Sequence, residues 1–126
     1  MATRHVLITH GTDTMAWCLP YLTYALKRLP FNVAITGSQR PLDAREGWSD
    51  AMGNLESAVR LLGLVRSPAV FAVFDSGRRV FTGSMLKVNK WDEDAFTGRD
   101  VLRMKDGTVQ WANLPLRAGG PRTDWA

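Results

Sequence analysis

Three short apolar runs restrict the possible folds of this chain more than any other feature of its sequence. They are His5–Thr9, Asn32–Thr36 and Ala69–Phe74. The runs are rich in Val, Ile and Phe and do not alternate with polar residues, which is typical of strands buried on both faces of a parallel sheet. We therefore predict three parallel β-strands.

The segment between the first two runs predicts a helix from about Asp13 to Leu29, which Thr12 or Asp13 can cap. Its apolar stripe should face the core and consists of Met15, Leu19, Leu22, Leu26 and Leu29. Pro20 removes a helical hydrogen bond, so we expect either a kink there or a break with a restart at Pro20.

The segment before the third run predicts a helix from about Ser49 to Leu62 that ends at Gly63. Its expected core face consists of Ala51, Met52, Leu55, Ala58, Val59 and Leu62. The β-α-β-α-β order indicates an α/β fold, an open and mostly parallel sheet of Rossmann or flavodoxin type. We expect helices on both faces and right-handed crossovers.

The pattern changes after the third run. Arg79–Thr82 indicates a short strand, and the polar segment Lys87–Asp94 indicates a short helix. Val101–Met104 and Thr108–Ala112 flank Asp106-Gly107, which predicts a C-terminal β-hairpin. We expect a single domain over residues 1–116.

Composition narrows the function classes. A chain of 126 residues with 45% hydrophobic residues suits one packed domain, and we expect residues 117–126 to form a flexible tail. Cys18 is the only cysteine, which excludes an internal disulfide and favours a cytoplasmic location. No apolar stretch has the length of a membrane span, so we expect no membrane partner.

The net charge of +4 raises the question of nucleic-acid binding. The basic residues are scattered, however, and no aromatic residues alternate with them to form a stacking platform. The charge pattern therefore favours an ordinary arginine-rich surface, and we expect no nucleic-acid partner.

A small polar loop follows each predicted strand, and these loops indicate a binding site. They are Gly11-Thr12-Asp13, Gly37-Ser38-Gln39 and Asp75-Ser76-Gly77. Parallel strands bring such loops to one edge of the sheet, where small residues let a ligand approach the backbone. The same residue types are also ordinary turn formers, so plain turns remain the alternative.

Generic catalytic motifs are absent from the sequence. No Gly-x-Gly-x-x-Gly follows the first strand, and no cysteine or histidine cluster has metal-ligand spacing, so we expect no cofactor and no metal. Ser38, His10 and Asp13 could form a Ser-His-Asp triad, but no nucleophile elbow accompanies them. We therefore disfavour that triad.

Two segments carry a resemblance to a known family. Ile8–Met15 (ITHGTDTM) resembles the second signature of the bacterial L-asparaginase/glutaminase family. Ile35–Pro41 (ITGSQRP) is similar to the strand and loop that follow, closest to the cytoplasmic type I branch. Ser49-Asp50 and Asn54 match as well. The resemblance extends from about His5 to Phe96, because Lys87 and the later Asp94-Ala95-Phe96 are similar to the family's lysine segment.

The resemblance implies roles for individual residues. Thr12 matches a threonine of the catalytic centre, Asp13 the aspartate that holds the substrate's α-amino group, and Lys87 the lysine paired with it. A threonine hydroxyl is a poor nucleophile unless a base or a charged neighbour perturbs it. Lys87 could act as that base or stay charged and polarise the hydroxyl. We expect Gly11 and Ser38 to bind substrate together with Asp13.

The sequence also departs from the family pattern. It does not contain the family's Thr-Gly-Gly-Thr strand, which supplies another threonine commonly assigned as the nucleophile, nor the lid tyrosine or the C-terminal domain. Thr97-Gly98-Arg99 replaces the usual Ser-Pro-Asn. The resemblance implies hydrolysis of L-asparagine to L-aspartate and ammonia without a cofactor, with weak or no activity in this shortened form. The alternative is a non-catalytic amino-acid-binding or interaction module derived from the same fold.

Self-association is a further expectation. Strands that carry Val6, Ile8, Val33 and Ile35 should be covered on both faces, and the chain has five tryptophans. Tryptophan is favoured at interfaces, and an open sheet edge can pair with another chain. We therefore expect a homo-oligomer; a monomer whose C-terminal hairpin covers the edge is the alternative.

Overall fold

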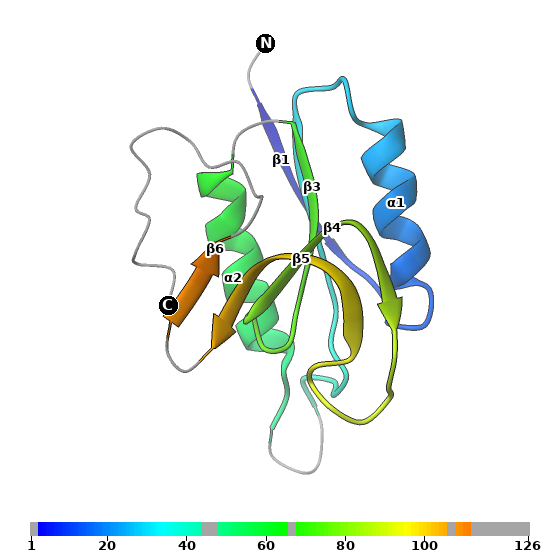
Figure 1. Cartoon of the computed structure of the whole chain (residues 1–126), viewed down its shortest axis with the longest axis vertical. Coiled ribbons are helices and arrows are strands. Elements are labelled where there is room, and N and C mark those ends of the chain that lie inside the picture. The colour runs from blue at the N-terminus through cyan, green and yellow to red at the C-terminus, as the bar shows by residue number, and fades with distance from the viewer. Residues whose placement is uncertain (1–2, 44–47, 66–67, 106–107, 112–126) are drawn as a thin grey trace.

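The computed structural model describes residues 3–43, 48–65, 68–105 and 108–111, and these residues form a six-stranded sheet with two helices (Figure 1). The strands lie side by side in the order in which they occur in the sequence. The elements are β1 (Arg4–Thr9), α1 (Met15–Ala25), β2 (Phe31–Thr36), α2 (Ala51–Leu64), β3 (Ala69–Phe74), β4 (Arg79–Lys87), β5 (Phe96–Lys105) and β6 (Thr108–Trp111).

The three predicted parallel strands are confirmed as β1, β2 and β3. Val6 pairs with Val33 and Val33 with Val70, both in parallel register. The central strand β2 is buried from Asn32 to Thr36, as its unbroken apolar sequence predicts. The carboxyl ends of the three strands therefore lie together at one edge of the sheet.

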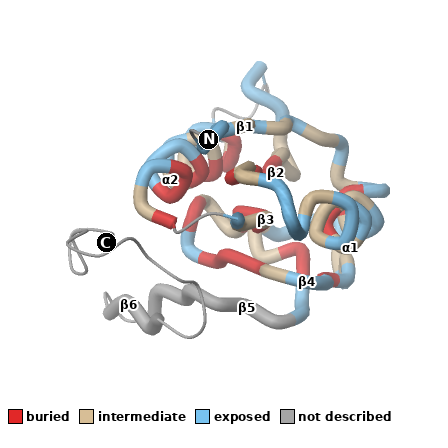
Figure 2. Tube along the Cα trace, turned by 90° about the horizontal axis from the view of Figure 1, so that it is seen from above, coloured by how far each residue is buried: buried red, intermediate tan, exposed pale blue. Residues whose placement is uncertain are grey.

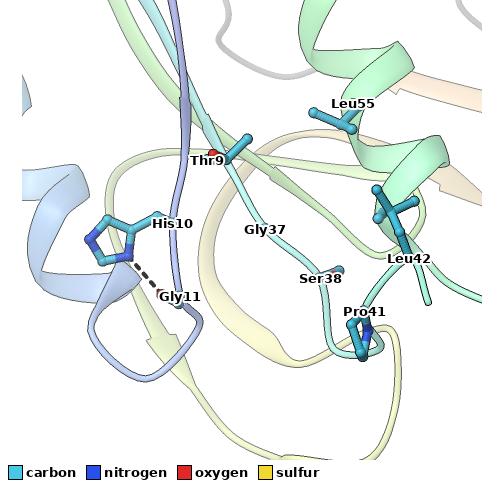
Figure 3. Close-up of a pocket in the computed structure, with 9 residues that line it drawn as sticks. Thr9, His10, Gly11, Gly37, Ser38, Pro41, Leu42 and Leu55 are labelled. Atoms are coloured by element: carbon cyan, nitrogen blue, oxygen red, sulfur yellow. Dashed lines mark hydrogen bonds between the residues drawn. The ribbon is translucent and has the colours of Figure 1, made fainter. Parts of the chain in front are cut away.

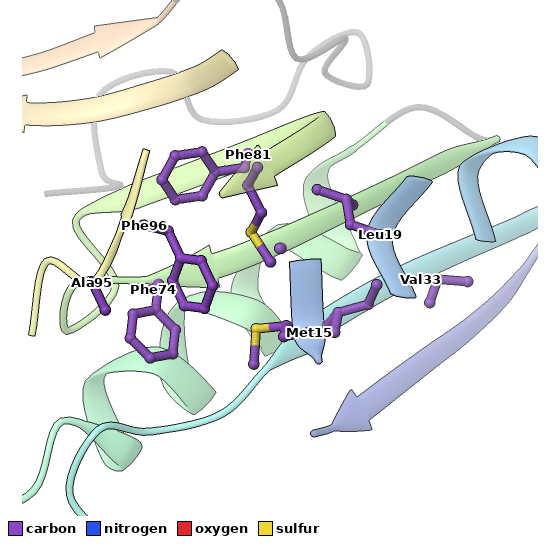
Figure 4. Close-up of a cluster of buried hydrophobic side chains, with 10 residues drawn as sticks. Met15, Leu19, Val33, Phe74, Phe81, Ala95 and Phe96 are labelled. Carbon is purple, nitrogen blue, oxygen red and sulfur yellow. The ribbon is translucent and has the colours of Figure 1, made fainter. Parts of the chain in front are cut away.

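The two helices cover opposite faces of this sheet, as predicted (Figure 2). Val33 and Ile35 pack in the same cluster as α1, whereas Ala34 packs in the same cluster as α2. Successive side chains of a strand point to opposite faces, so β2 separates two cores. Figure 4 shows the core on the α1 side, where Phe74 and Phe96 pack edge to face with ring centroids 4.8 Å apart.

The placement of the helices corrects the prediction of two right-handed crossovers. Both crossovers connect adjacent strands and advance in the same direction across the sheet, from β1 to β2 and from β2 to β3. Two connections of one hand would place both helices on the same face. Because α1 and α2 lie on opposite faces, one of the two crossovers is left-handed.

Helix α1 is shorter than predicted and passes through Pro20 without ending. Its N-cap is Thr14, which makes no side-chain capping hydrogen bond, so neither Thr12 nor Asp13 caps it. The prediction of a restart at Pro20 is wrong, because Met15 and Leu19 are both fully buried and hold the helix against the sheet ahead of the proline.

The rest of the predicted stripe of α1 is largely correct. Leu22 and Leu26 are partly buried and pack against the core on the α1 side. Leu29 is the exception, because it lies beyond the helix and is 45% exposed.

Helix α2 begins at Ala51 and continues through Gly63, which does not end it. Ala51, Ala58 and Leu62 are buried as predicted, together with Asn54 and Leu61, and Leu55 is partly buried. Met52 and Val59 are more than half exposed, so their assignment to the core face is wrong. Each lies one residue after a core position and is therefore rotated by about 100° toward solvent.

Strand β4 has the least regular course in the sheet. It starts antiparallel to β3, with Arg79 opposite Phe74, and then bends at Gly83, whose φ is +77°. Three residues of β4 lie between Phe81 and Met85, while β5 has only one residue between their partners. Figure 1 shows β4 curving so that its last residues lie beside the beginning of α1.

The bend extends β4 well beyond the predicted strand Arg79–Thr82 and includes Lys87. The predicted helix over Lys87–Asp94 is wrong, because Val88–Ala95 forms a loop between β4 and β5. The C-terminal hairpin is confirmed by antiparallel pairing of Lys105 with Thr108 and of Leu102 with Trp111. The predicted tail, 117–126, lies outside the described residues. Neither helix is long and apolar enough to cross a membrane, within the described ranges.

Candidate active site

The loops after β1 and β2 approach each other closely at the carboxyl edge of the sheet. The backbone N–H of His10 donates to the carbonyl of Thr36 at 2.8 Å, which extends the parallel pairing beyond the strands. A Cβ at Gly37 would lie 2.3 Å from the carbonyl oxygen of His10 and 2.8 Å from Cε of Met15. Only glycine therefore allows this approach.

Lys87 reaches the loop after β1 from the end of the bent strand β4. Its Nζ donates a hydrogen bond to Thr12 Oγ1 at 2.7 Å and forms an ion pair with Asp13 Oδ1 at 3.1 Å. The Lys87 side chain is only 16% exposed, whereas the Asp13 side chain is 85% exposed. The structure thus brings together the three side chains that the sequence singles out for catalysis.

The Asp13 carboxyl is held in its charged form by neighbouring cations. The hydrogen bond from Lys87, its positive charge and the charge of Lys90 together lower the pKa of Asp13 below its ordinary value of 3.8. An ionised carboxylate that is open to solvent can bind an ammonium group. One of its oxygens contacts Lys87, which leaves the other facing outward for such a ligand.

A cavity of about 550 Å³ opens beside this group, on the side of α2 (Figure 3). Gly11 and Ser38, the other two predicted substrate-binding residues, both line it. His10 Nδ1 lies 2.7 Å from the carbonyl oxygen of Gly11 and must donate to it, because a carbonyl can only accept. The other lining residues are Thr9, His10, Gly37, Pro41, Leu42, Ala51 and Leu55.

The predicted site residues therefore fall into two adjoining groups. Thr12, Asp13 and Lys87 touch one another, while Ser38 lines the cavity, and no hydrogen bond between described residues connects Ser38 to these three. Gly11 adjoins both groups, because it lines the cavity and precedes Thr12. The disfavoured Ser-His-Asp triad likewise has no hydrogen bond joining its members in the described residues.

Asp50 and Asn54 hold the edge together, and sequence reasoning assigned them no role. The buried Asp50 carboxylate accepts the backbone N–H groups of Gln39 at 2.9 Å and Arg40 at 3.0 Å. Asn54 donates to the carbonyl of Gly37 at 2.9 Å and accepts the N–H of Gly77 at 3.0 Å. Two polar residues on the otherwise apolar inner face of α2 are the signal that could have revealed this network.

Gln39 connects the network to the loop that follows Lys87. Its Nε2 donates to the carbonyl of Asn89 at 3.3 Å. Asn89 in turn accepts the backbone N–H groups of Trp91 and Asp92 and donates to the carbonyl of Asp94. The loops after β2 and β4 are therefore fastened together on either side of the candidate site.

The third predicted loop contributes support rather than free side chains. Asp75 and Ser76 both have positive φ, at +58° and +53°. Asp75 forms an ion pair with Arg78 at 2.6 Å, and Arg78 also pairs with Glu93 at 2.6 Å. Burial raises the pKa of Asp75, and Arg78 opposes that shift. This loop meets the candidate site only through the Gly77–Asn54 hydrogen bond.

Known proteins resemble this chain along most of its length. The family description "Asparaginase, N-terminal" matches residues 3–115. A probable cytoplasmic L-asparaginase from Campylobacter jejuni superposes with a TM-score of 0.62 at 25% identity, covering 90% of this chain and 35% of that one. An L-asparaginase from Thermococcus kodakarensis is 41% identical over 54 residues, which are 43% of this chain and 16% of that protein.

The relatives differ in their names and are all much longer. A 60 kDa lysophospholipase of Homo sapiens is 36% identical over 78 residues, which are 62% of this chain and 13% of that protein. This chain thus spans less than a fifth of the curated relatives it matches. The matched region includes the loops and the bent strand that form the candidate site. With a family match over residues 3–115, the chain belongs to the asparaginase family and corresponds to its N-terminal domain.

Proposed function

We propose that this chain carries the amide-hydrolysing half-site of an L-asparaginase-like amidohydrolase, with L-asparagine as substrate and L-aspartate and ammonia as products. The observation that carries the proposal is the contact of Lys87 Nζ with Thr12 Oγ1 at 2.7 Å beside the exposed carboxylate of Asp13. These are the residues that the family resemblance assigns to catalysis. An amino acid is the small-molecule partner that this arrangement fits.

The contacts support distinct tasks for the three side chains. Lys87 donates to the oxygen of Thr12, so it can stabilise negative charge that develops on this oxygen when the hydroxyl proton leaves. This arrangement favours the polarising role of Lys87 over its role as a base. Asp13 orients Lys87 and offers its outward oxygen to the substrate's α-ammonium group.

Gly11 and Ser38 are proposed to receive the rest of the substrate. Both line the 550 Å³ cavity, which adjoins Thr12 and is large enough for an amino acid. No cofactor or metal is needed for this hydrolysis, because water supplies the elements that replace the amide nitrogen.

Turnover by the 126-residue chain is proposed to be low. The resemblance implies a second threonine as nucleophile, and this sequence does not contain that motif. Loss of a catalytic nucleophile commonly lowers turnover by on the order of 10⁴–10⁶. We further propose a cytoplasmic location and a homo-oligomeric state.

Two measurements on the purified chain test the function. Calorimetry with L-aspartate should detect binding that Asp13→Asn abolishes, and an ammonia-release assay with L-asparagine should detect slow turnover that Thr12→Ala abolishes. Thr14→Ala is the matched control, because the neighbouring Thr14 makes no capping hydrogen bond through its side chain. Binding without turnover would support the amino-acid-binding module instead, and the absence of both would contradict the proposal.

A further inference from the structure

The outer face of α1 has the character of an interface rather than of an ordinary surface. Trp17, Tyr21 and Tyr24 are 77%, 71% and 76% exposed. No residue of α1 from Met15 to Ala25 is charged. A surface helix of a globular protein normally carries charged and polar residues on its outer face, and a helix that is apolar all round is normally covered.

The three aromatic side chains form one continuous stripe. Their spacing of four and three residues places them on neighbouring turns of one helix face. Met15 and Leu19, which are fully buried, occupy the opposite face against the sheet. The stripe is therefore not needed for the core, and its aromatic composition is that of binding hot spots.

We propose that this aromatic stripe is the interface between two copies of the chain, which pack α1 against α1 in antiparallel orientation about a two-fold axis near Tyr21. In this arrangement Trp17 of each copy lies opposite Tyr24 of the partner subunit, and the two Tyr21 side chains meet at the axis. A stripe whose midpoint is also aromatic is self-complementary, as a two-fold interface requires.

The charges that flank the stripe agree with the antiparallel orientation. Asp13 lies before the first turn of α1, and Lys27 and Arg28 lie just beyond its end. Antiparallel packing places the acidic end of one helix beside the basic end of the other, and it also pairs opposite ends of the helix dipoles. Parallel packing would place like charges together.

The available area is sufficient for a reversible dimer. Trp and Tyr bury about 150–250 Å² each, so three side chains that are three-quarters exposed offer roughly 350–550 Å² per copy. Two copies together would bury about 700–1,100 Å² through these side chains alone, near the lower end of specific interfaces. The dimer should therefore form at micromolar concentrations.

Sedimentation velocity of the full chain tests this interface. The wild type should have twice the 14.0 kDa chain mass at tens of micromolar, and Tyr21→Glu should have the mass of one chain with unchanged far-ultraviolet circular dichroism. Val59→Glu is the matched control, because Val59 is 57% exposed on the other helix, and this variant should remain dimeric. A monomeric wild type, or a dimer that persists in Tyr21→Glu, would overturn the proposal.

A cross-linking experiment distinguishes this interface from other modes of pairing. In a Cys18→Ser background, Tyr21→Cys should form an intermolecular disulfide under mild oxidation, because the two-fold axis brings the two positions together. Met52→Cys, on the exposed face of α2, should not. A wild-type dimer that cross-links through Met52→Cys but not through Tyr21→Cys would place the interface elsewhere and refute the α1 pairing.

Discussion

Lys87 and Thr12 are 75 residues apart in the sequence, and their side chains meet at 2.7 Å. A straight β4 would run back toward the amino ends of the parallel strands and would carry Lys87 about 26 Å from Arg79, at about 3.3 Å per residue. The bend at Gly83 returns the strand to the carboxyl edge instead. The catalytic contact therefore depends on the conformation of one glycine far from the site's chemistry.

Gly83→Val should weaken both the fold and this contact. The φ of +77° is strained for any β-branched residue, so we expect a loss of about 1–3 kcal/mol in the free energy of unfolding, measured by urea denaturation. Gly63→Ala provides the control, because it lies in α2 with open space around its Cα and should stabilise by about 0.5–1 kcal/mol. Equal stability of Gly83→Val and the wild type would show that the bend is not strained.

Lys87→Met should raise the pKa of Asp13 toward its ordinary value of 3.8, because the largest cause of the present lowering is the Lys87 hydrogen bond. The sign of the pH dependence follows from the lowered pKa. The ion pair stabilises the folded state above the unfolded-state pKa and is lost as the pH falls through the folded-state pKa.

Titration of the Asp13 side-chain carbon by nuclear magnetic resonance measures this effect. Lys90→Met should raise the Asp13 pKa by less, because Lys90 acts only through its charge. An unchanged Asp13 titration in Lys87→Met would mean that the two groups do not interact in solution.

Asn54→Ala should loosen the edge where the loops after β2 and β3 meet. The substitution leaves the buried carbonyl of Gly37 and the N–H of Gly77 without this partner, so we expect a loss of about 1–3 kcal/mol in unfolding free energy. Ser57→Ala, which removes a longer hydrogen bond to Gly77 at 3.3 Å, should cost less. The ranking of the two variants by chemical denaturation checks the assignment, and a reversed order would contradict it.

Gln39→Ala should free the loop after Lys87 while leaving the core intact. Only the 3.3 Å hydrogen bond to the Asn89 carbonyl is removed, so global stability should fall by no more than about 0.5–1.5 kcal/mol. Hydrogen exchange at the Trp91 and Asp92 amides should quicken, while exchange in β2 stays slow. Unchanged exchange at both amides would show that Asn89 holds the loop by itself.

The sequence predicts the parallel half of the sheet well because complete burial leaves a clear pattern. Strand β2 must be apolar on both faces, and Val33, Ala34 and Ile35 show this directly. The contact between Thr12 and Lys87 was predictable only through the family resemblance, since a lone lysine is ordinarily a surface residue.

The bent strand and the crossover hand were not predictable from local patterns. Thr82-Gly83-Ser84 has the composition of a turn, so Arg79–Thr82 was expected to end there, whereas the ribbon continues because β5 bends with β4. Periodicity shows that α1 and α2 each have an apolar face. It carries no information about which side of the sheet that face covers.

The division of the interior by β2 links ligand binding to local unfolding. Thr12 and Asp13 precede the helix that packs on one core, whereas Ser38 lies in the loop fastened to the helix that packs on the other. A ligand that contacts both groups ties the two layers together, so neither could open without releasing it. Slowed amide exchange on both faces of the sheet at once, in proportion to ligand occupancy, would be the thermodynamic signature of a site built across two separate cores.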